Sequence, residues 1–237
     1  MSNDFYIIIP SRISSTRIKK KPLVNLNGKT LIQRVFSNAL EITPNSYVAT
    51  DSIEIKNNIV HMSSNIVMTS DTHISGTDRI FEAANTLNIT DNSLIINLQG
   101  DEPFIPKDLI KQLIDDYSIK KCDVITCSKK VNDEKDINDP NCVLVETNDK
   151  NYATKFIREG IIKNPKKHIG IYGYSFKTLS ELISLKPTSN ELLYKLEQLR
   201  FLENNYSIYV SEYNKEIPAG IDTEEDLDNA NKYLKSL

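Results

Sequence analysis

The chain has 237 residues, and its 29 Lys and Arg nearly balance its 32 Asp and Glu, for a net charge of −3. This length fits one large domain or one domain with a modest insertion, and the balanced charge argues against a general nucleic-acid binder, whose surface would be basic. The longest clean apolar run, residues 5–9, is far shorter than the roughly 20 residues of a membrane helix. With no signal-peptide pattern at the N-terminus and no zinc spacing among Cys122, Cys127 and Cys142, we expect a cytoplasmic globular protein with free thiols and no membrane insertion.

The first half of the chain alternates short apolar strands with amphipathic helices. Runs that are apolar on both faces, typical of strands buried in a parallel sheet, occur at residues 5–9, 47–49, 66–68 and 94–98. Between them, Thr30 and Gln33 form a capping-box pattern before one helix, an apolar stripe over 80–87 indicates a second, and Pro106 opens a third. This repeated order predicts a parallel, doubly wound α/β sheet with helices on both sides.

The second half has a more mixed pattern. We predict strands at 123–131, 142–146, 168–174 and 206–211, with a polar loop at 132–141. Thr188 is expected to cap one helix that carries Leu192, Leu196, Leu199 and Leu202 on one face, and the last helix begins near Thr223. No repeat or linker divides the chain, so we predict a single domain over 1–237, in which 123–170 is the best candidate for an insertion into the parallel core.

The first candidate site is the loop that follows the first strand. Five cations lie within ten residues there, together with several hydroxyls: Arg12, Arg17, Lys19, Lys20 and Lys21. Ligands of open α/β sheets bind beyond the carboxyl ends of the strands, so this loop suits a polyphosphate. The loop contains no glycine, which disfavours a P-loop or a dinucleotide-binding loop. The alternative is a solvated basic loop.

Two acidic residues form the second candidate site. Asp101 follows an apolar strand and a glycine, in the sequence Gln99–Pro103, and a carboxylate at that edge of a sheet is a natural Mg²⁺ ligand. Asp222 directly precedes the last helix. The alternatives are an ordinary turn for Asp101 and, at the second position, a helix start with Asp222 or Thr223 as the N-cap. A metal site requires the fold to bring the two carboxylates face to face.

Further polar groups occur in three other places. Residues 75–79 read Ser-Gly-Thr-Asp-Arg, which is either a backbone-donor loop or a helix N-terminus. His168 and Tyr172 lie on a predicted strand, and Glu197 and Gln198 on a predicted helix, so they are candidates for contacting a hydroxylated substrate. A histidine on a strand is more often a structural residue.

Taken in this order, the five motifs resemble the CMP-Kdo synthetase family, the 3-deoxy-manno-octulosonate (Kdo) cytidylyltransferases, from Ile7 to Leu234. The most specific matches are Ser75–Arg79, Gln99–Pro103, His168–Tyr174, Leu196–Arg200 and Gly220–Thr223. The resemblance implies a three-layer α/β/α sandwich of the nucleotide-diphospho-sugar transferase type and a homodimer, with 123–170 contributing to dimerisation and to the sugar pocket. It implies transfer of CMP from CTP to a 3-deoxy-ulosonic acid, most simply Kdo, with release of pyrophosphate, for bacterial surface polysaccharide synthesis.

The resemblance also implies roles for individual residues. Arg12, Arg17 and Lys21 match the loop that binds the CTP triphosphate, and Ser75 and Gly76 match the loop near the cytosine and ribose. Asp101 and Asp222 match the magnesium ligands, and with Arg12 and Lys21 they form the catalytic set. The sugar-acid pocket corresponds to Gln99, Arg158, His168, Tyr172, Glu197 and Gln198.

The chain departs from the family pattern in two segments. Lys19-Lys20 stands where the family usually has Pro-Gly, so we expect a less constrained loop that cannot exploit the positive φ of glycine. After Arg158 the usual Ile-Pro is replaced by residues 159–162, Glu-Gly-Ile-Ile. The second departure keeps open a cytidylyltransferase for an amino-substituted Kdo or another nonulosonate. The first departure keeps open a nucleotide-binding paralogue without catalysis.

Overall fold

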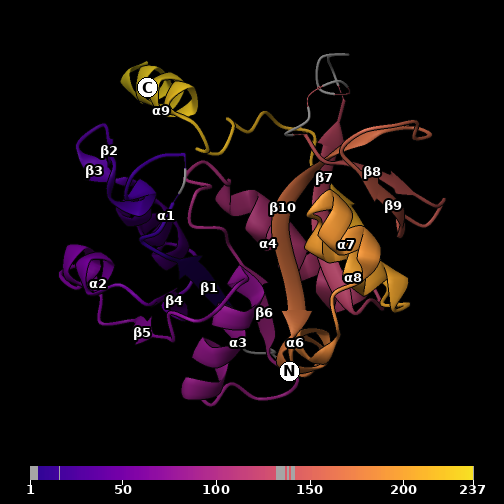
Figure 1. Cartoon of the computed structure of the whole chain (residues 1–237), viewed down its shortest axis with the longest axis horizontal. Helices are drawn as coiled ribbons and strands as arrows, with labels where there is room; N and C mark the ends of the chain where they lie inside the picture. The colour runs from indigo at the N-terminus through magenta and orange to yellow at the C-terminus, as the bar shows by residue number, and fades with distance from the viewer. Residues whose placement is uncertain (1–4, 16, 132–136, 138, 140–141, 237) are drawn as a thin grey trace. The chain divides into compact units, whose positions relative to one another are not determined.

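The computed structural model describes residues 5–15, 17–131, 137, 139 and 142–236 (Figure 1). Its residue contacts divide the chain into two compact units. The first unit comprises Met1–Asp108 and Glu216–Leu237, and the second comprises Leu109–Lys215. The segment 123–170 lies wholly in the second unit. Its contribution to a dimer and to a sugar pocket stays a prediction.

The first unit contains a parallel sheet with the strand order β6-β1-β4-β5. Its strands are β1 (Phe5–Ser11), β4 (Ser46–Thr50), β5 (Ile66–Met68) and β6 (Leu94–Asn97). All four coincide with the apolar runs of the sequence. Ile7, Ile8 and Ile9 are completely buried, as expected for a strand covered on both faces.

Helices connect these strands in the way that a doubly wound sheet requires. They are α1 (Leu31–Leu40), α2 (Ile53–Ile59) and α3 (Gly76–Thr86), followed by α4 (Lys107–Ile119), which continues into the second unit, and by α9 (Glu224–Lys235). The order β1-β4-β5 runs one way across the sheet, and the return to β6 runs the other way. Because parallel crossovers are right-handed, α1 and α2 cover one face and α3 covers the other.

The short connection between β1 and α1 also has regular structure. It contains a 3₁₀ helix, η1 (Lys21–Leu23), and a small hairpin of β2 (Asn25–Leu26) and β3 (Lys29–Thr30). The predicted capping box at the start of α1 is present, because Thr30 Oγ1 accepts from the Gln33 N–H and Gln33 Oε1 accepts from the Thr30 N–H.

The second unit is built around β7 (Val124–Lys130), which pairs parallel with β11 (Ile208–Glu212) and antiparallel with β10 (Lys166–Ser175). A hairpin of β8 (Leu144–Thr147) and β9 (Ala153–Ile157) continues from β10. The register of β10 against β7 shifts between Ile169 and Tyr172, around Gly170. The helices are α6 (Phe176–Ser184), α7 (Ser189–Tyr194) and α8 (Glu197–Glu203).

One predicted helix of this unit is wrong. The single helix expected from Thr188 to Leu202 is two helices, because Lys195 adopts a left-handed conformation, with φ 54° and ψ 47°, and ends α7. Leu196 and Leu199 are buried, but Leu192 is 66% exposed. The leucine spacing therefore merged two short helices, of which only α8 buries residues. Most of the predicted loop at 132–141 lies outside the described residues.

The cysteines match the expectation of free thiols. Cys122, Cys127 and Cys142 are free thiols, and the last two are buried. No helix in the described part of the chain combines the length and the apolar character needed to cross a membrane.

Candidate active site

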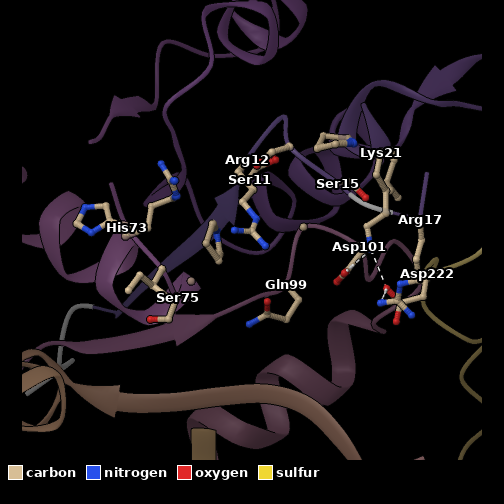
Figure 2. Close-up of a pocket in the computed structure, with 18 residues that line it drawn as sticks. Ser11, Arg12, Ser15, Arg17, Lys21, His73, Ser75, Gln99, Asp101 and Asp222 are labelled. Carbon is tan, nitrogen blue, oxygen red and sulfur yellow. Dashed lines mark hydrogen bonds and ion pairs between the residues drawn. The ribbon is translucent and has the colours of Figure 1, made fainter. Parts of the chain in front are cut away.

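A cavity of about 570 Å³ opens in the first unit at the carboxyl ends of β1 and β6 (Figure 2). In the sheet, β4 lies on one side of β1 and β6 lies on the other. The chain runs from β1 to β4 and β5 and then returns to β6, so the direction of winding reverses between β1 and β6. Open α/β sheets bind ligands at such a switch point. The lining comes from the loops after β1, β5 and β6 and from the segment before α9.

Two glycines let these loops approach one another closely. A Cβ added to Gly100 would lie 3.0 Å from the Pro10 carbonyl oxygen, and one added to Gly76 would lie 3.2 Å from Pro10 Cγ. Both glycines therefore allow their loops to pack against the end of β1, which places Asp101 and Ser75 at the same cavity.

The centre of one end of the cavity is a three-residue ion cluster. Lys21 Nζ lies 2.7 Å from Asp101 Oδ2 and 2.9 Å from Asp222 Oδ1, and Figure 2 shows the ammonium between the two carboxylates. Burial disfavours the charge on Lys21, but the carboxylates of Asp101 and Asp222 outweigh it and raise the pKa of Lys21 above its ordinary value. The juxtaposition of Asp101 and Asp222 expected from the sequence is thus observed.

The segment before α9 frees the Asp222 side chain for this cluster. Thr223, not Asp222, is the N-cap of α9, because its hydroxyl accepts from the Asp226 N–H. Asp226 in turn accepts from the backbone N–H groups of Asp222 and Thr223. Asp222 is therefore not the N-cap, and its carboxylate pairs with Lys21 instead.

The two arginines of the cationic loop have different environments. Arg17 Nη2 pairs with Asp222 Oδ1 at 2.8 Å, and both side chains are about half exposed. Arg12 lines the cavity, is exposed, and forms no ion pair with any residue that the structure describes. Arg12 is thus the cation of this loop that is ready to receive an anionic ligand.

The residues present fit a divalent cation that is shared with a ligand. Asp101 and Asp222 supply carboxylate oxygens, the donors that Mg²⁺ prefers, and Mg²⁺ commonly uses one or two carboxylates together with phosphate oxygens and water. Among the described residues no group of three His, Cys, Asp or Glu forms a cage for a metal by itself. This donor set therefore suits a metal that arrives with a phosphorylated ligand.

The other end of the cavity is formed by the loop that leads into α3. Ser75 is the N-cap of α3, with a capping box to Asp78, so the helix-terminus interpretation of this motif is correct. Ser75 and Gly76 also line the cavity, next to His73 and Arg79. Their predicted contacts with cytosine and ribose stay predictions.

Sequence reasoning missed His73 and the lining role of Arg79. His73 Nε2 contacts Glu82 Oε2, which also accepts from the Ser70 N–H. Arg79 is almost completely buried and binds Asp51 Oδ2 at 2.8 Å. The only available signal was proximity in sequence to Ser75, because neither pairing follows from a local pattern.

Gln99 is the one predicted sugar-acid residue in the first unit. It lines the cavity, and its Nε2 donates to Asn97 Oδ1 at 2.8 Å. The other five belong to the second unit, at the end of β9, on β10 and at the start of α8: Arg158, His168, Tyr172, Glu197 and Gln198.

Four of these five residues interact within the second unit. The His168 and Tyr172 rings have centroids 5.5 Å apart. Burial, with the charge of Arg158, lowers the pKa of His168 to about 3, and burial, with the charge of Glu197, raises the pKa of Tyr172. Gln198 is buried. Arg158, His168, Tyr172 and Glu197 therefore lie close to one another, and the predicted role of the whole set in binding a sugar acid stays a prediction.

His168 also has a definable protonation pattern. Thr126 Oγ1 donates to the Ile171 carbonyl at 2.7 Å, so it accepts from His168 Nε2 at 2.9 Å. The ring is thus a neutral Nε2–H tautomer, whose Nδ1 is an acceptor. The structural role of this histidine and a role in binding are compatible.

Comparison with known proteins identifies the family. The sequence matches the family described as Cytidylyltransferase over residues 6–216. A 3-deoxy-manno-octulosonate cytidylyltransferase from Polynucleobacter necessarius is 38% identical over 98% of this chain and 96% of its own length, and one from Thermodesulfovibrio yellowstonii is 39% identical over 97% of each. The chain belongs to the cytidylyltransferase family. The resemblance inferred from the sequence motifs is confirmed.

Solved structures agree with this family assignment. The structure of a CMP:2-keto-3-deoxy-manno-octonic acid synthetase complexed with CTP superimposes with a TM-score of 0.91 and 29% identity, over 98% of this chain and 99% of that one. A putative glucose-1-phosphate thymidylyltransferase from Bacillus anthracis has a TM-score of 0.70 at 15% identity, over 98% and 96% of the two chains, which shows a shared fold. The predicted α/β class is thus confirmed.

One expectation about this family member is wrong. The loop with Lys19-Lys20 in place of Pro-Gly does use a positive φ, because Lys20 itself has φ 50° and ψ 43°. A left-handed conformation costs an L-residue about 1–2 kcal/mol. Lys20 Nζ pairs with Glu54 Oε2 at 2.5 Å, and its carbonyl accepts from the Leu23 N–H at 2.8 Å, which offsets part of that cost. The loop that presents Lys21 therefore contains a left-handed residue without having a glycine there.

Proposed function

We propose that this protein transfers CMP from CTP to the anomeric hydroxyl of Kdo and releases pyrophosphate. The observation that carries the proposal is the convergence of Lys21, Asp101 and Asp222 in a cavity at the switch point of the sheet. Relatives that are 36–39% identical over nearly their whole length are named as 3-deoxy-manno-octulosonate cytidylyltransferases, which supports this substrate pair.

The chemistry that the site must assist is a displacement at phosphorus. The anomeric oxygen of the sugar acid forms a bond to the α-phosphorus of CTP, the bond from that phosphorus to the bridging oxygen of the β-phosphate breaks, and the hydroxyl proton is released. Such reactions depend on positioning and charge neutralisation more than on a covalent side chain. Arg12, Arg17 and Lys21 supply the positive charge for the triphosphate and for the departing pyrophosphate.

Asp101 and Asp222 are the residues that would hold Mg²⁺. When bound, this ion neutralises charge on the phosphate oxygens and makes the attacking hydroxyl more acidic. The carboxylates themselves fix where that charge is supplied, because both belong to short segments that pack against each other.

We assign the sugar acid to the polar cluster of the second unit. The guanidinium of Arg158 suits the carboxylate of the acid, and the Nδ1 atom of His168 suits one of its hydroxyls as an acceptor. Tyr172, Glu197 and Gln198 supply further polar groups, from β10 and α8.

The direct test is a pyrophosphate-release assay with CTP, Mg²⁺ and Kdo. We expect turnover with Kdo and none without it. Inactivity on Kdo together with clear activity on an amino-substituted Kdo or a nonulosonate would change the substrate and keep the reaction. CTP binding by calorimetry with no product on any acid would instead identify a non-catalytic nucleotide-binding protein.

The proposal also covers the cellular setting. We infer a cytoplasmic homodimer that activates the sugar acid for bacterial surface polysaccharide, including lipopolysaccharide. Sedimentation equilibrium of the full chain measures the assembly, and a monomer at micromolar concentration would remove the dimer from the proposal.

A further inference from the structure

The ammonium of Lys21 lies where two metal-binding carboxylates converge. Its Nζ is within 3 Å of an oxygen of Asp101 and of one of Asp222. An ammonium has three N–H donors and no acceptor, so it can satisfy both carboxylates at once. The Lys21 side chain is 15% exposed, whereas those of Asp101 and Asp222 are 36% and 48% exposed. Lys21 is therefore the most enclosed member of the cluster.

The two carboxylates depend on Lys21 to different degrees. Asp222 is also paired with Arg17, at 2.8 Å. Lys21 is the one cation within ion-pair distance of Asp101 in the part of the chain that the structure describes. Without the ammonium, Asp101 would therefore hold an uncompensated negative charge beside a second carboxylate.

The same amino group is expected to serve a second anion. The cationic loop after β1 places Lys21 at the cavity in which the triphosphate would bind. A single ammonium has too few donors to hold two carboxylates and a triphosphate fully. A divalent cation on Asp101 and Asp222 would also repel a positive charge located between them. The positions of Lys21 before and after loading are therefore expected to differ.

We propose that Lys21 is the resident counter-ion of the Asp101–Asp222 pair, and that a divalent cation displaces its ammonium from the carboxylates and releases it to the nucleotide. The inference rests on the proposed function, because it takes these two aspartates to be the metal ligands. Without nucleotide, Lys21 therefore competes with the metal for the two carboxylates. With nucleotide bound, Lys21 and the metal both contribute positive charge to the nucleotide.

The test measures Mn²⁺ binding without nucleotide, by the electron paramagnetic resonance signal of the free ion. Lys21→Met removes the ammonium and should bind Mn²⁺ at least about fivefold more tightly than the wild type, because a charge in direct contact with both ligands is removed. Lys19→Met is the matched control. It removes the same charge from an exposed side chain of the same loop and should change the affinity by less than about twofold.

A second titration measures the coupling between Mn²⁺ and CTP by calorimetry, without sugar acid. In the wild type, Mn²⁺ should strengthen CTP binding by a larger factor than in Lys21→Met, because only the wild type has an ammonium to release. The variant should also bind CTP more weakly when metal is present. The same substitution is thus expected to raise the affinity for Mn²⁺ and to reduce the factor by which Mn²⁺ strengthens CTP binding.

Two results would overturn the inference. One is Mn²⁺ binding to Lys21→Met that is no tighter than binding to the wild type, or not detectable. The other is an equal gain in Lys19→Met, which would assign the effect to the general charge of the loop. Thermal unfolding checks that the variants fold, and Lys21→Gln, which keeps a neutral donor, replaces Lys21→Met if that variant does not fold.

The failure of the proposed function would look different. If Asp101→Asn and Asp222→Asn leave Mn²⁺ binding unchanged in the Lys21→Met background, the metal ligands are wrong. If Mn²⁺ behaves as expected but Kdo is not a substrate in the pyrophosphate assay, the counter-ion role stands and the sugar acid is wrong.

Discussion

The backbone N–H of Ile221 donates a hydrogen bond of 2.9 Å to the carbonyl oxygen of Asp101. This bond joins the loop after β6 to the segment before α9, which are far apart in the sequence. The residue after Ile221 is Asp222, so the bond brings the second carboxylate beside the first. Ile221 is completely buried, which anchors the segment in the core. The acidic half of the site is therefore fixed by backbone geometry.

Asp101→Asn tests the catalytic role of this arrangement. The substitution keeps the shape of the side chain but removes the charge that would hold the metal and that pairs with Lys21. We expect turnover to fall at least ~100-fold, as when a group that stabilises a transition-state charge is removed. The measurement is pyrophosphate release under saturating CTP and sugar acid.

Asp228→Asn is the control for this substitution. Asp228 is exposed on α9 in the same unit, so the variant makes the same chemical change away from the cavity. Its turnover should equal that of the wild type. A near-normal rate for Asp101→Asn would remove Asp101 from the active site.

Gly100→Ala tests whether the close approach of the β6 loop to β1 positions Asp101. The added Cβ would lie 3.0 Å from the Pro10 carbonyl oxygen, which belongs to a buried strand and cannot easily move. We expect a loss of about 1–2 kcal/mol in the free energy of unfolding, as for other overpacked sites, and lower turnover because the displaced residue adjoins Asp101.

Gly170→Ala is the comparison variant for unfolding. A Cβ at Gly170 meets no atom within 4 Å. Its loss of stability should stay below about 0.5 kcal/mol. Equal denaturation midpoints for the two variants would show that the contact with Pro10 is unimportant.

How much was predictable depends on whether a residue's position follows from a local pattern. The four strands of the first unit were found because Ile7, Ile8 and Ile9, like the other runs, are apolar on both faces. The helix caps at Thr30 and Thr188 were also local signals. Asp101 and Asp222 could be paired only through the resemblance, because no local pattern joins segments so distant in sequence.

The residues that sequence reasoning misjudged are those whose conformation is imposed by tertiary contacts. Lys20 and Lys195 both adopt positive φ, although nothing in their residue type favours it. Lys20 is held by Glu54 of α2, and the break at Lys195 allows Leu196 to be buried. His73 reached the cavity through its loop and its contact with Glu82, which no motif marked.

Lys20→Gly tests the cost of the left-handed conformation. Relief of that conformation is worth about 1–2 kcal/mol, against about 0.4–1 kcal/mol for the greater freedom of the unfolded chain and up to about 1 kcal/mol for the exposed pair with Glu54. At their middle values these contributions nearly cancel, so we expect a small gain of about 0.3 kcal/mol in the free energy of unfolding, measured by urea denaturation.

Lys19→Gly gives the matched comparison. Lys19 lies in the same loop and does not have a positive φ, so glycine brings only the entropic penalty there. That variant should lose about 0.5–1 kcal/mol. A loss in Lys20→Gly as large as that in Lys19→Gly would contradict the prediction.

The depressed pKa of His168 predicts how stability depends on pH. In the unfolded chain His168 takes up a proton below its ordinary pKa of about 6.5, whereas the folded protein keeps the ring neutral until the pH approaches about 3. Between these values the unfolded state binds more protons, so stability rises with pH and falls as the pH is lowered through this window.

The variant His168→Gln tests this dependence, because glutamine cannot titrate but can still donate to Thr126. Its unfolding free energy, measured by urea denaturation from pH 7 to pH 4.5, should fall less steeply than that of the wild type. The two proteins have all other titratable groups in common, so the difference between the slopes reports His168 alone. Parallel curves for the two proteins would show that His168 is protonated as easily in the fold as in the unfolded chain.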